Sequence, residues 1–149
     1  MELKSSITKL EPWGILPLDR VYTGLPNLSF NLLRTCNKEA SISAIGHFLK
    51  TGIELDQRVA LVSFDHPAYL LTSFKKHGFY LEEELLSEQL IYLYYKPVFS
   101  HSLNFSTNYR QLLDETKALS RGDISRIAFL NADVLFNLET HLLAESSAE

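Results

Sequence analysis

Cysteine, long apolar runs and clustered positive charge are all scarce in this chain of 149 residues. Cys36 is the only cysteine, which excludes an intramolecular disulfide and a cysteine-based metal cluster. No stretch approaches the roughly 18 apolar residues that a membrane-spanning helix needs, and the N-terminus lacks the apolar segment of a signal peptide. We therefore expect a cytoplasmic protein that does not insert into a membrane directly and could reach one only through a partner.

Basic residues do not gather anywhere in the sequence. The formal net charge is −4, and the longest basic run is Lys75-Lys76, followed by His77. A general affinity for nucleic acid is therefore not expected, because such binding depends on many positive charges on one surface. Metal binding is not expected either, because the histidines lack the spacing of metal ligands; they are His47, His66, His77, His101 and His141.

The composition fits one globular domain, since 46% of the residues are hydrophobic and 21% are charged. Residues 1–23 are interrupted by proline and glycine and predict an irregular N-terminal arm. This arm carries apolar side chains, among them Trp13 and Leu16. Two interpretations follow: the arm packs across the domain's own sheet, or it binds a partner.

Strand-like and helix-like segments alternate along the rest of the chain. This alternation predicts an α/β fold with a mainly parallel central sheet flanked by helices. Asn37 is a candidate N-cap for the first long helix, and Gly52 is a candidate stop signal for it. The predicted strands are 30–33, 59–64, 90–95 and 124–130, and the predicted helices are 41–50, 67–77, 112–119 and 134–144. The segment 81–86 is predicted to be a further helix or a turn.

Short motifs recur in one register over residues 24–97. GLP (24–26) leads into the first predicted strand, FLKTG (48–52) ends the helix that follows, and VALVSFD (59–65) forms the next strand. In this order the motifs resemble the KaiC-type branch of the RecA-like P-loop ATPases. The resemblance implies a RecA-like domain over residues 24–149. Because family members continue well beyond the corresponding strand, it implies a C-terminally truncated domain or a fragment of a longer protein.

The phosphate-binding loop of that family is degenerate in this chain. The loop reads TCNKEASI (35–42) and contains no glycine, although close wrapping of phosphate by backbone N–H groups needs glycine. Ser41 stands where the family has its phosphate-binding lysine, and Ile42 where it has its Mg²⁺-binding hydroxyl. Lys38 comes three residues too early and is followed by Glu39, whose charge repels phosphate.

The acidic residues of the family's catalytic site are also displaced. Asp65-His66 occupies the place of a glutamate pair, one member of which acts on the attacking water. Leu130 or Asn131 holds the place of the metal-binding aspartate, and Asp133 is out of register. The resemblance with these losses implies a pseudo-ATPase with no catalytic residues, no enzyme activity and no cofactor.

An assembly role is the leading hypothesis for such a domain. It predicts a non-catalytic module for protein interaction and oligomerisation in a bacterial regulatory or secretion complex, with a protein partner or a second copy of the chain. This is an argument by analogy with the assembly of RecA-like domains. The candidate interaction residues are Trp13, Leu16, Leu135 and Phe136.

The alternative hypothesis is a sensor that holds a small molecule or a nucleotide in the old crevice without hydrolysis. Ligands of open α/β sheets bind beyond the carboxyl ends of the strands, where this crevice is expected. The candidate contacts are Asn37, Lys38, Ser41, Asp65 and His66.

Overall fold

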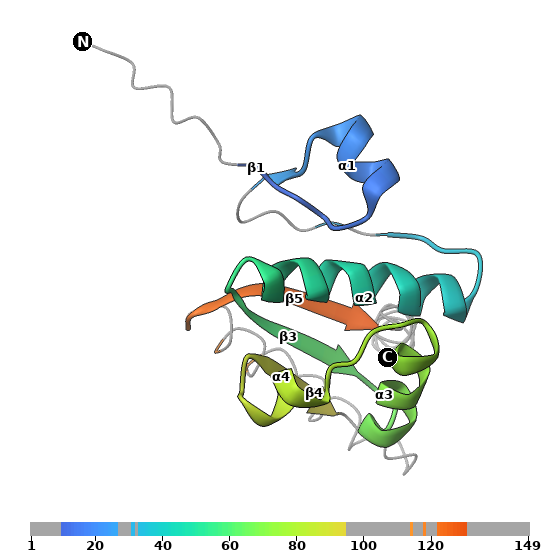
Figure 1. The fold of residues 1–149 in the computed structure, drawn as a ribbon, viewed down its shortest axis with the longest axis vertical. Coiled ribbons are helices and arrows are strands. Elements are labelled where there is room, and N and C mark those ends of the chain that lie inside the picture. Colours follow the sequence, from blue (N-terminus) through green and yellow to red (C-terminus); the bar gives the residue numbers. More distant parts are fainter. Residues whose placement is uncertain are drawn as a thin grey trace, which may run out of the picture.

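The computed structural model describes residues 10–26, 31, 33–94, 114, 118 and 122–130. Its main sheet has three parallel strands in the order β4-β3-β5 (Figure 1). These strands are β3 (Arg58–Ser63), β4 (Leu90–Tyr94) and β5 (Ile124–Leu130). The predicted α/β class with a parallel sheet flanked by helices is confirmed.

β3 is the central strand, and all of its residues after Arg58 are buried. Val59 aligns with Leu90 of β4 on one side and with Arg126 of β5 on the other. Leu61 aligns in the same way with Tyr92 and Ala128. A strand that has neighbours on both sides and is covered on both faces is expected to be continuously apolar, as 59–62 is.

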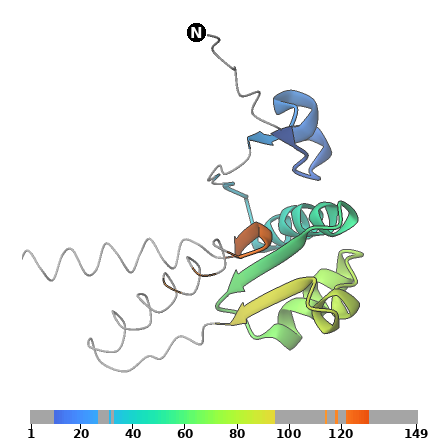
Figure 2. The ribbon, with the colours of Figure 1, turned by 90° about the vertical axis from the view of Figure 1, so that its left-hand side faces the viewer.

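Three helices pack on one face of this sheet (Figure 2). They are α2 (Lys38–Glu54), α3 (Pro67–Lys76) and α4 (Glu82–Leu86). Pro67 occupies the first turn of α3, as predicted. The apolar core between helices and sheet consists of Ile42, Leu49, Val59, Leu61, Leu70, Phe74, Phe79, Leu81, Leu90, Ala128 and Leu130.

The helix predicted over 41–50 is confirmed, and it extends beyond both predicted ends. Asn37 caps it as predicted, because its side-chain oxygen accepts a hydrogen bond of 2.8 Å from the backbone N–H of Ala40. The prediction that Gly52 stops the helix is wrong, since Gly52 lies inside α2 and is buried. A Cβ at this position would lie 2.7 Å from side-chain atoms of Val59 and Arg126. The glycine therefore permits close packing of the helix on the sheet.

The strand predicted over 30–33 is wrong at both of its described residues. Asn31 and Leu33 are exposed and lie outside every strand. In the RecA-like arrangement this segment would have paired with the sheet. Here the described sheet consists of β4, β3 and β5, and neither Asn31 nor Leu33 adds a strand to it.

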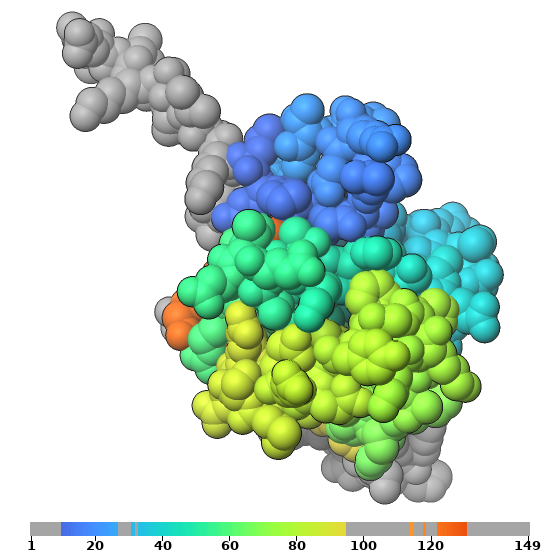
Figure 3. All heavy atoms as spheres, in the orientation of Figure 1, coloured from blue at the N-terminus to red at the C-terminus, as the bar shows by residue number. Residues whose placement is uncertain are grey.

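The N-terminal part forms a small unit of two short strands joined by a helix. β1 (Leu10–Glu11) pairs antiparallel with β2 (Leu25–Pro26), and α1 (Leu16–Tyr22) lies between them in sequence. We call residues 10–26 the β1–α1–β2 unit. It lies next to α2 (Figures 1 and 3), and its Glu11 reaches Arg126 of β5. The described part of the arm therefore meets the domain at α2 and at Arg126 of β5, whereas the prediction was packing across the sheet.

Two predicted helices fall mostly or wholly outside the described residues. The segment 134–144, which contains the candidate interaction residues Leu135 and Phe136, is not among them. Of the segment 112–119, Asp114 and Ala118 are described, and both are helical.

Candidate functional site

The predicted crevice lies where β3 ends and α2 and α3 begin. The structure brings Lys38, the first residue of α2, next to Asp65 in the turn after β3. Their Nζ and Oδ2 atoms are 2.9 Å apart, and the two side chains are 41% and 23% exposed. An ion pair therefore spans the gap between the start of α2 and the end of the central strand.

Neighbouring groups fix both members of this ion pair. The Lys38 Nζ lies 4.8 Å from the centroid of the Tyr69 ring, which is within range of a cation–π interaction. The backbone N–H of Asp65 donates to the hydroxyl of Ser63 at 3.0 Å. Its backbone carbonyl accepts from the hydroxyl of Tyr92 at 2.7 Å. The turn that carries Asp65 is thus held from β3 and from β4.

The surroundings of Tyr92 widen the pH range over which its hydroxyl stays neutral. Burial raises the pKa of Tyr92 to about 12, and the negative charge of Asp65 adds to this shift. A neutral phenol keeps its proton and can donate it to the Asp65 carbonyl. The hydrogen bond between β4 and the turn after β3 is therefore expected to persist above pH 10, where an exposed tyrosine loses its proton.

His66 serves α3 in this structure. Its Nδ1 accepts a hydrogen bond of 3.2 Å from the backbone N–H of Ala68, which caps the helix. The imidazole ring lies edge-on to the ring of Tyr94, with centroids 5.5 Å apart. This capping role gives a structural reason for a histidine at position 66, directly after Asp65.

The remaining crevice candidates are engaged in local hydrogen bonds. Asn37 caps α2, and the Ser41 hydroxyl lies 2.5 Å from the hydroxyl of Thr35. Ile42, at the position where the resemblance predicts the loss of a metal-binding hydroxyl, is buried in the core at 3% exposure. The segment 35–42 is thus a turn and a capped helix start. In the described part of the chain, no three histidine, cysteine, aspartate or glutamate side chains are grouped to hold a metal ion.

The two described interaction candidates lie in different environments. Trp13 is partly buried, and its indole Nε1 has no hydrogen-bond partner among the described residues. Leu16 is 61% exposed at the start of α1.

A buried arginine between the β1–α1–β2 unit and the sheet was not predicted. Arg126 of β5 is only 4% exposed. Its Nε donates to Oε1 of Gln57 at 2.7 Å, and its Nη1 donates to the backbone carbonyl of Phe48 at 3.3 Å. Its Nη2 lies 3.7 Å from Oε2 of Glu11 in β1. Burial lowers the pKa of Arg126 from its ordinary value, while the charges of Glu11 and Asp19 raise it.

The sequence of β5 carried a signal for this arginine. Side chains alternate between the two faces of a strand, so Arg126 shares a face with Ala128 and Leu130. A charged residue on an otherwise apolar face is expected to need a partner, because burying an unpaired charge is costly. The alternation indicated the buried charge, but it could not indicate that residue 11 supplies the carboxylate.

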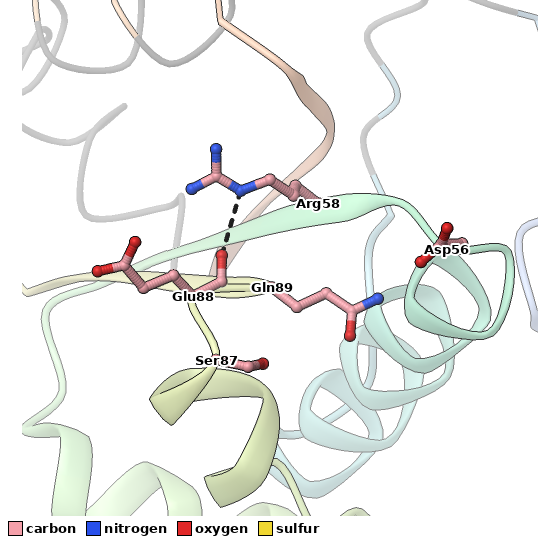
Figure 4. A pocket seen from close by; sticks show the side chains of 5 residues that line it. All are labelled: Asp56, Arg58, Ser87, Glu88 and Gln89. Carbon is pink, nitrogen blue, oxygen red and sulfur yellow. Dashed lines mark hydrogen bonds between the residues drawn. The ribbon is translucent and has the colours of Figure 1, made fainter.

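A shallow hollow of about 430 Å³ lies at the opposite end of the sheet (Figure 4). It is lined by Asp56, Arg58, Ser87, Glu88 and Gln89, near the amino ends of β3 and β4. Its one cation is already engaged, since Arg58 donates to the Glu88 carbonyl at 3.2 Å and pairs with Asp123 at 2.5 Å. Ligands of parallel sheets bind at the other end, so this hollow is a weaker candidate than the Lys38–Asp65 region.

No protein-family model matches the chain, and comparison with curated proteins finds no match. None of the helices in the described ranges has the length and apolar character needed to cross a membrane.

Proposed function

We propose that this chain is a non-catalytic, RecA-like α/β domain that works as a protein-interaction and assembly module in a bacterial regulatory or secretion complex. The observation that supports this most is the ion pair between Lys38 and Asp65. It occupies the end of the central strand, where a nucleotide-binding relative would hold phosphate.

The ion pair disfavours phosphate for an electrostatic reason. Lys38 is the only lysine in the segment 35–42, and its charge is already neutralised by a carboxylate 2.9 Å away. A polyphosphate that displaced Asp65 from Lys38 would come close to the negative charge of the freed carboxylate. A glycine-rich loop would compensate with several backbone N–H groups, but the segment 35–42 has no glycine.

The outer strands of the sheet support an assembly role. Among the described strands, β4 and β5 each have one hydrogen-bonded neighbour, which is β3. The outer strand of a sheet is a site at which another chain can pair. In a domain of this fold that no longer binds a nucleotide, the outer sides of β4 and β5 can serve as pairing sites for another chain.

A thermal-shift assay tests the loss of nucleotide binding. We expect no change in melting temperature with ATP or GTP, with or without Mg²⁺, because a ligand that binds only the folded state must raise it. Light scattering over a concentration series then measures self-association. A shift with ATP that depends on Mg²⁺ would overturn the proposal.

A second candidate function is a small-molecule sensor at the same place. It is favoured by the aromatic rings around the ion pair, since Tyr69 is 56% exposed, Tyr94 is 38% exposed and His66 is also exposed. Exposed rings next to paired charges can stack on a planar ligand. Cyclic dinucleotides and small metabolites in the same assay test this, and a shift that Tyr69→Ala removes, while Tyr80→Ala retains it, would favour the sensor.

A further inference from the structure

The β1–α1–β2 unit holds itself together by its own contacts. Its strands pair Leu10 with Pro26 and Glu11 with Leu25. The Asp19 carboxylate accepts hydrogen bonds from the backbone N–H groups of Trp13 at 2.6 Å and Gly14 at 2.9 Å. α1 has no buried residue, so the helix does not depend on the rest of the domain for a core.

One carboxylate of the unit, that of Glu11, bonds to the body of the domain. Oε2 of Glu11 accepts a hydrogen bond of 2.9 Å from Nε2 of Gln57 and lies 3.7 Å from Nη2 of Arg126. That Nη2 has no hydrogen bond in the described part of the chain, although the Arg126 side chain is only 3% exposed. We call this buried guanidinium, together with Gln57 and the facing part of α2, the Arg126 seat. Because the Nη2 of Arg126 lacks a hydrogen bond among the described residues, the seat selects an acidic residue.

A second contact adds a steric requirement to this charge requirement. Gly14 has φ +84°, and a Cβ there would lie 2.5 Å from the backbone carbonyl of His47 in α2. Only glycine permits this close approach of the unit to the helix. The seat on α2 and β5 thus recognises an acidic residue followed three positions later by glycine, both of which the unit supplies.

We propose that two copies of this chain exchange their β1–α1–β2 units, each unit occupying the Arg126 seat of the other copy. The occupant is a second copy because the seat is already complementary to this unit in charge and in shape. Exchange of a self-contained element keeps the contacts described above between the unit and its seat, so it is a low-cost route to a dimer. The inference rests on the proposed assembly function and names the surface that carries it.

Energy transfer between two differently marked full-length chains tests the exchange. Trp13 is the only tryptophan and lies in the unit, while Cys36 is the only cysteine, is exposed and directly precedes α2. The donor is the unmodified chain, and the acceptor is the Trp13→Phe chain labelled at Cys36 with a tryptophan-excited dye. The two are mixed at equal concentration in mild urea, which loosens the seat, and then diluted. Because donor and acceptor sit on different chains, exchange predicts transfer that increases with protein concentration.

Variants of the donor decide whether the Arg126 seat is responsible. Glu11→Arg brings a positive charge against Arg126 and is expected to abolish transfer, whereas the exposed control Glu83→Arg in α4 is expected to retain it. If Glu11→Arg does not fold by circular dichroism, the milder Glu11→Gln is expected to reduce transfer. Absence of transfer at every concentration would overturn the exchange. Transfer that survives both Glu11 variants would also overturn it and would indicate dimers through another surface, which leaves the assembly function standing.

Discussion

Gly52 of α2 lies directly against the side chain of Arg126 in β5. A Cβ built on Gly52 would be 2.7 Å from Cδ and 3.1 Å from Nε of the arginine. Val59 of β3 approaches the same point, with Cγ1 2.7 Å from that Cβ. The last turn of α2, the central strand and the buried guanidinium therefore meet at a position that has room for hydrogen only.

Gly52→Ala should destabilise the domain, although the same change usually stabilises a helix. An alanine in a helix interior is ordinarily favoured by roughly 0.5–1 kcal/mol, but here its methyl group overpacks the contact with Arg126 and Val59. We expect a loss of about 1–3 kcal/mol in the free energy of unfolding, measured by urea titration. Glu54→Ala, an exposed change in the same turn, is the control and should shift it by no more than about 0.5 kcal/mol. A stabilised Gly52→Ala variant would contradict the close packing.

Glu11 and Arg126 should be energetically coupled across the seat. Glu11→Gln removes the carboxylate that compensates a buried guanidinium, so we expect a loss of about 1–3 kcal/mol in the free energy of unfolding. In the Arg126→Met background the same change should matter much less, because no buried charge remains to be compensated. A double-mutant cycle from urea titrations gives the coupling energy.

The exposed pair Arg58–Asp123 provides the matched control for that cycle. Its side chains are 37% and 67% exposed, and solvent screens such pairs strongly. Arg58→Met and Asp123→Asn should show no measurable coupling. Equal coupling in the two cycles would mean that the Arg126 contact is an ordinary surface ion pair and not a buried seat.

The Lys38–Asp65 pair should contribute little to stability even though it joins the start of α2 to the end of β3. Both side chains are partly exposed, so Lys38→Met should lower the free energy of unfolding by less than about 1 kcal/mol. The difference should shrink in 1 M NaCl, where the screening length is about 3 Å. Lys76→Met, at an exposed position with no ion pair among the described residues, should show no such dependence on salt. A loss of several kcal/mol with Lys38→Met would show that the pair is a structural requirement.

Periodicity predicted the parts of the fold that depend on apolar burial. The helix around Ile42 and Leu49 and the strand 124–130 were predictable because each follows a regular pattern of core side chains. The segment 30–33 is a run of only four residues, too short to separate a strand from a connecting segment. At Leu33, which is 43% exposed, the apolar character of the sequence does not correspond to burial.

The misread residues are those whose roles depend on contacts far apart in the sequence. In its local sequence Gly52 resembles a helix stop. A glycine is needed there, however, because the side chain of Arg126 lies directly against it. Lys38 and Asp65 were both named for the crevice, but the sequence could not indicate that they would pair with each other. Arg126 could have been noticed by alternation, whereas its partner Glu11 lies in a separate unit that no local pattern connects to β5.

Stability should fall steeply in alkaline solution because of Tyr92. Burial raises the pKa of its hydroxyl to about 12 in the folded chain, against an ordinary value of 10.0. Below pH 10 both folded and unfolded states hold the proton, so this contribution to stability is fully present. Between pH 10 and 12 the unfolded state loses the proton while the folded state keeps it, so the free energy of unfolding falls as pH rises.

Tyr92→Phe isolates this effect, because every other titrating group is common to both proteins. Near pH 8 the variant should be less stable by about 1 kcal/mol, since the Asp65 carbonyl loses the hydrogen bond of 2.7 Å that Tyr92 donates. The stability difference should shrink between pH 10 and 12, as only the unmodified chain has the Tyr92 proton to lose. Urea titrations of both proteins at a series of pH values measure it. A difference that stays constant up to pH 12 would show that the Tyr92 hydroxyl is not buried against the turn that carries Asp65.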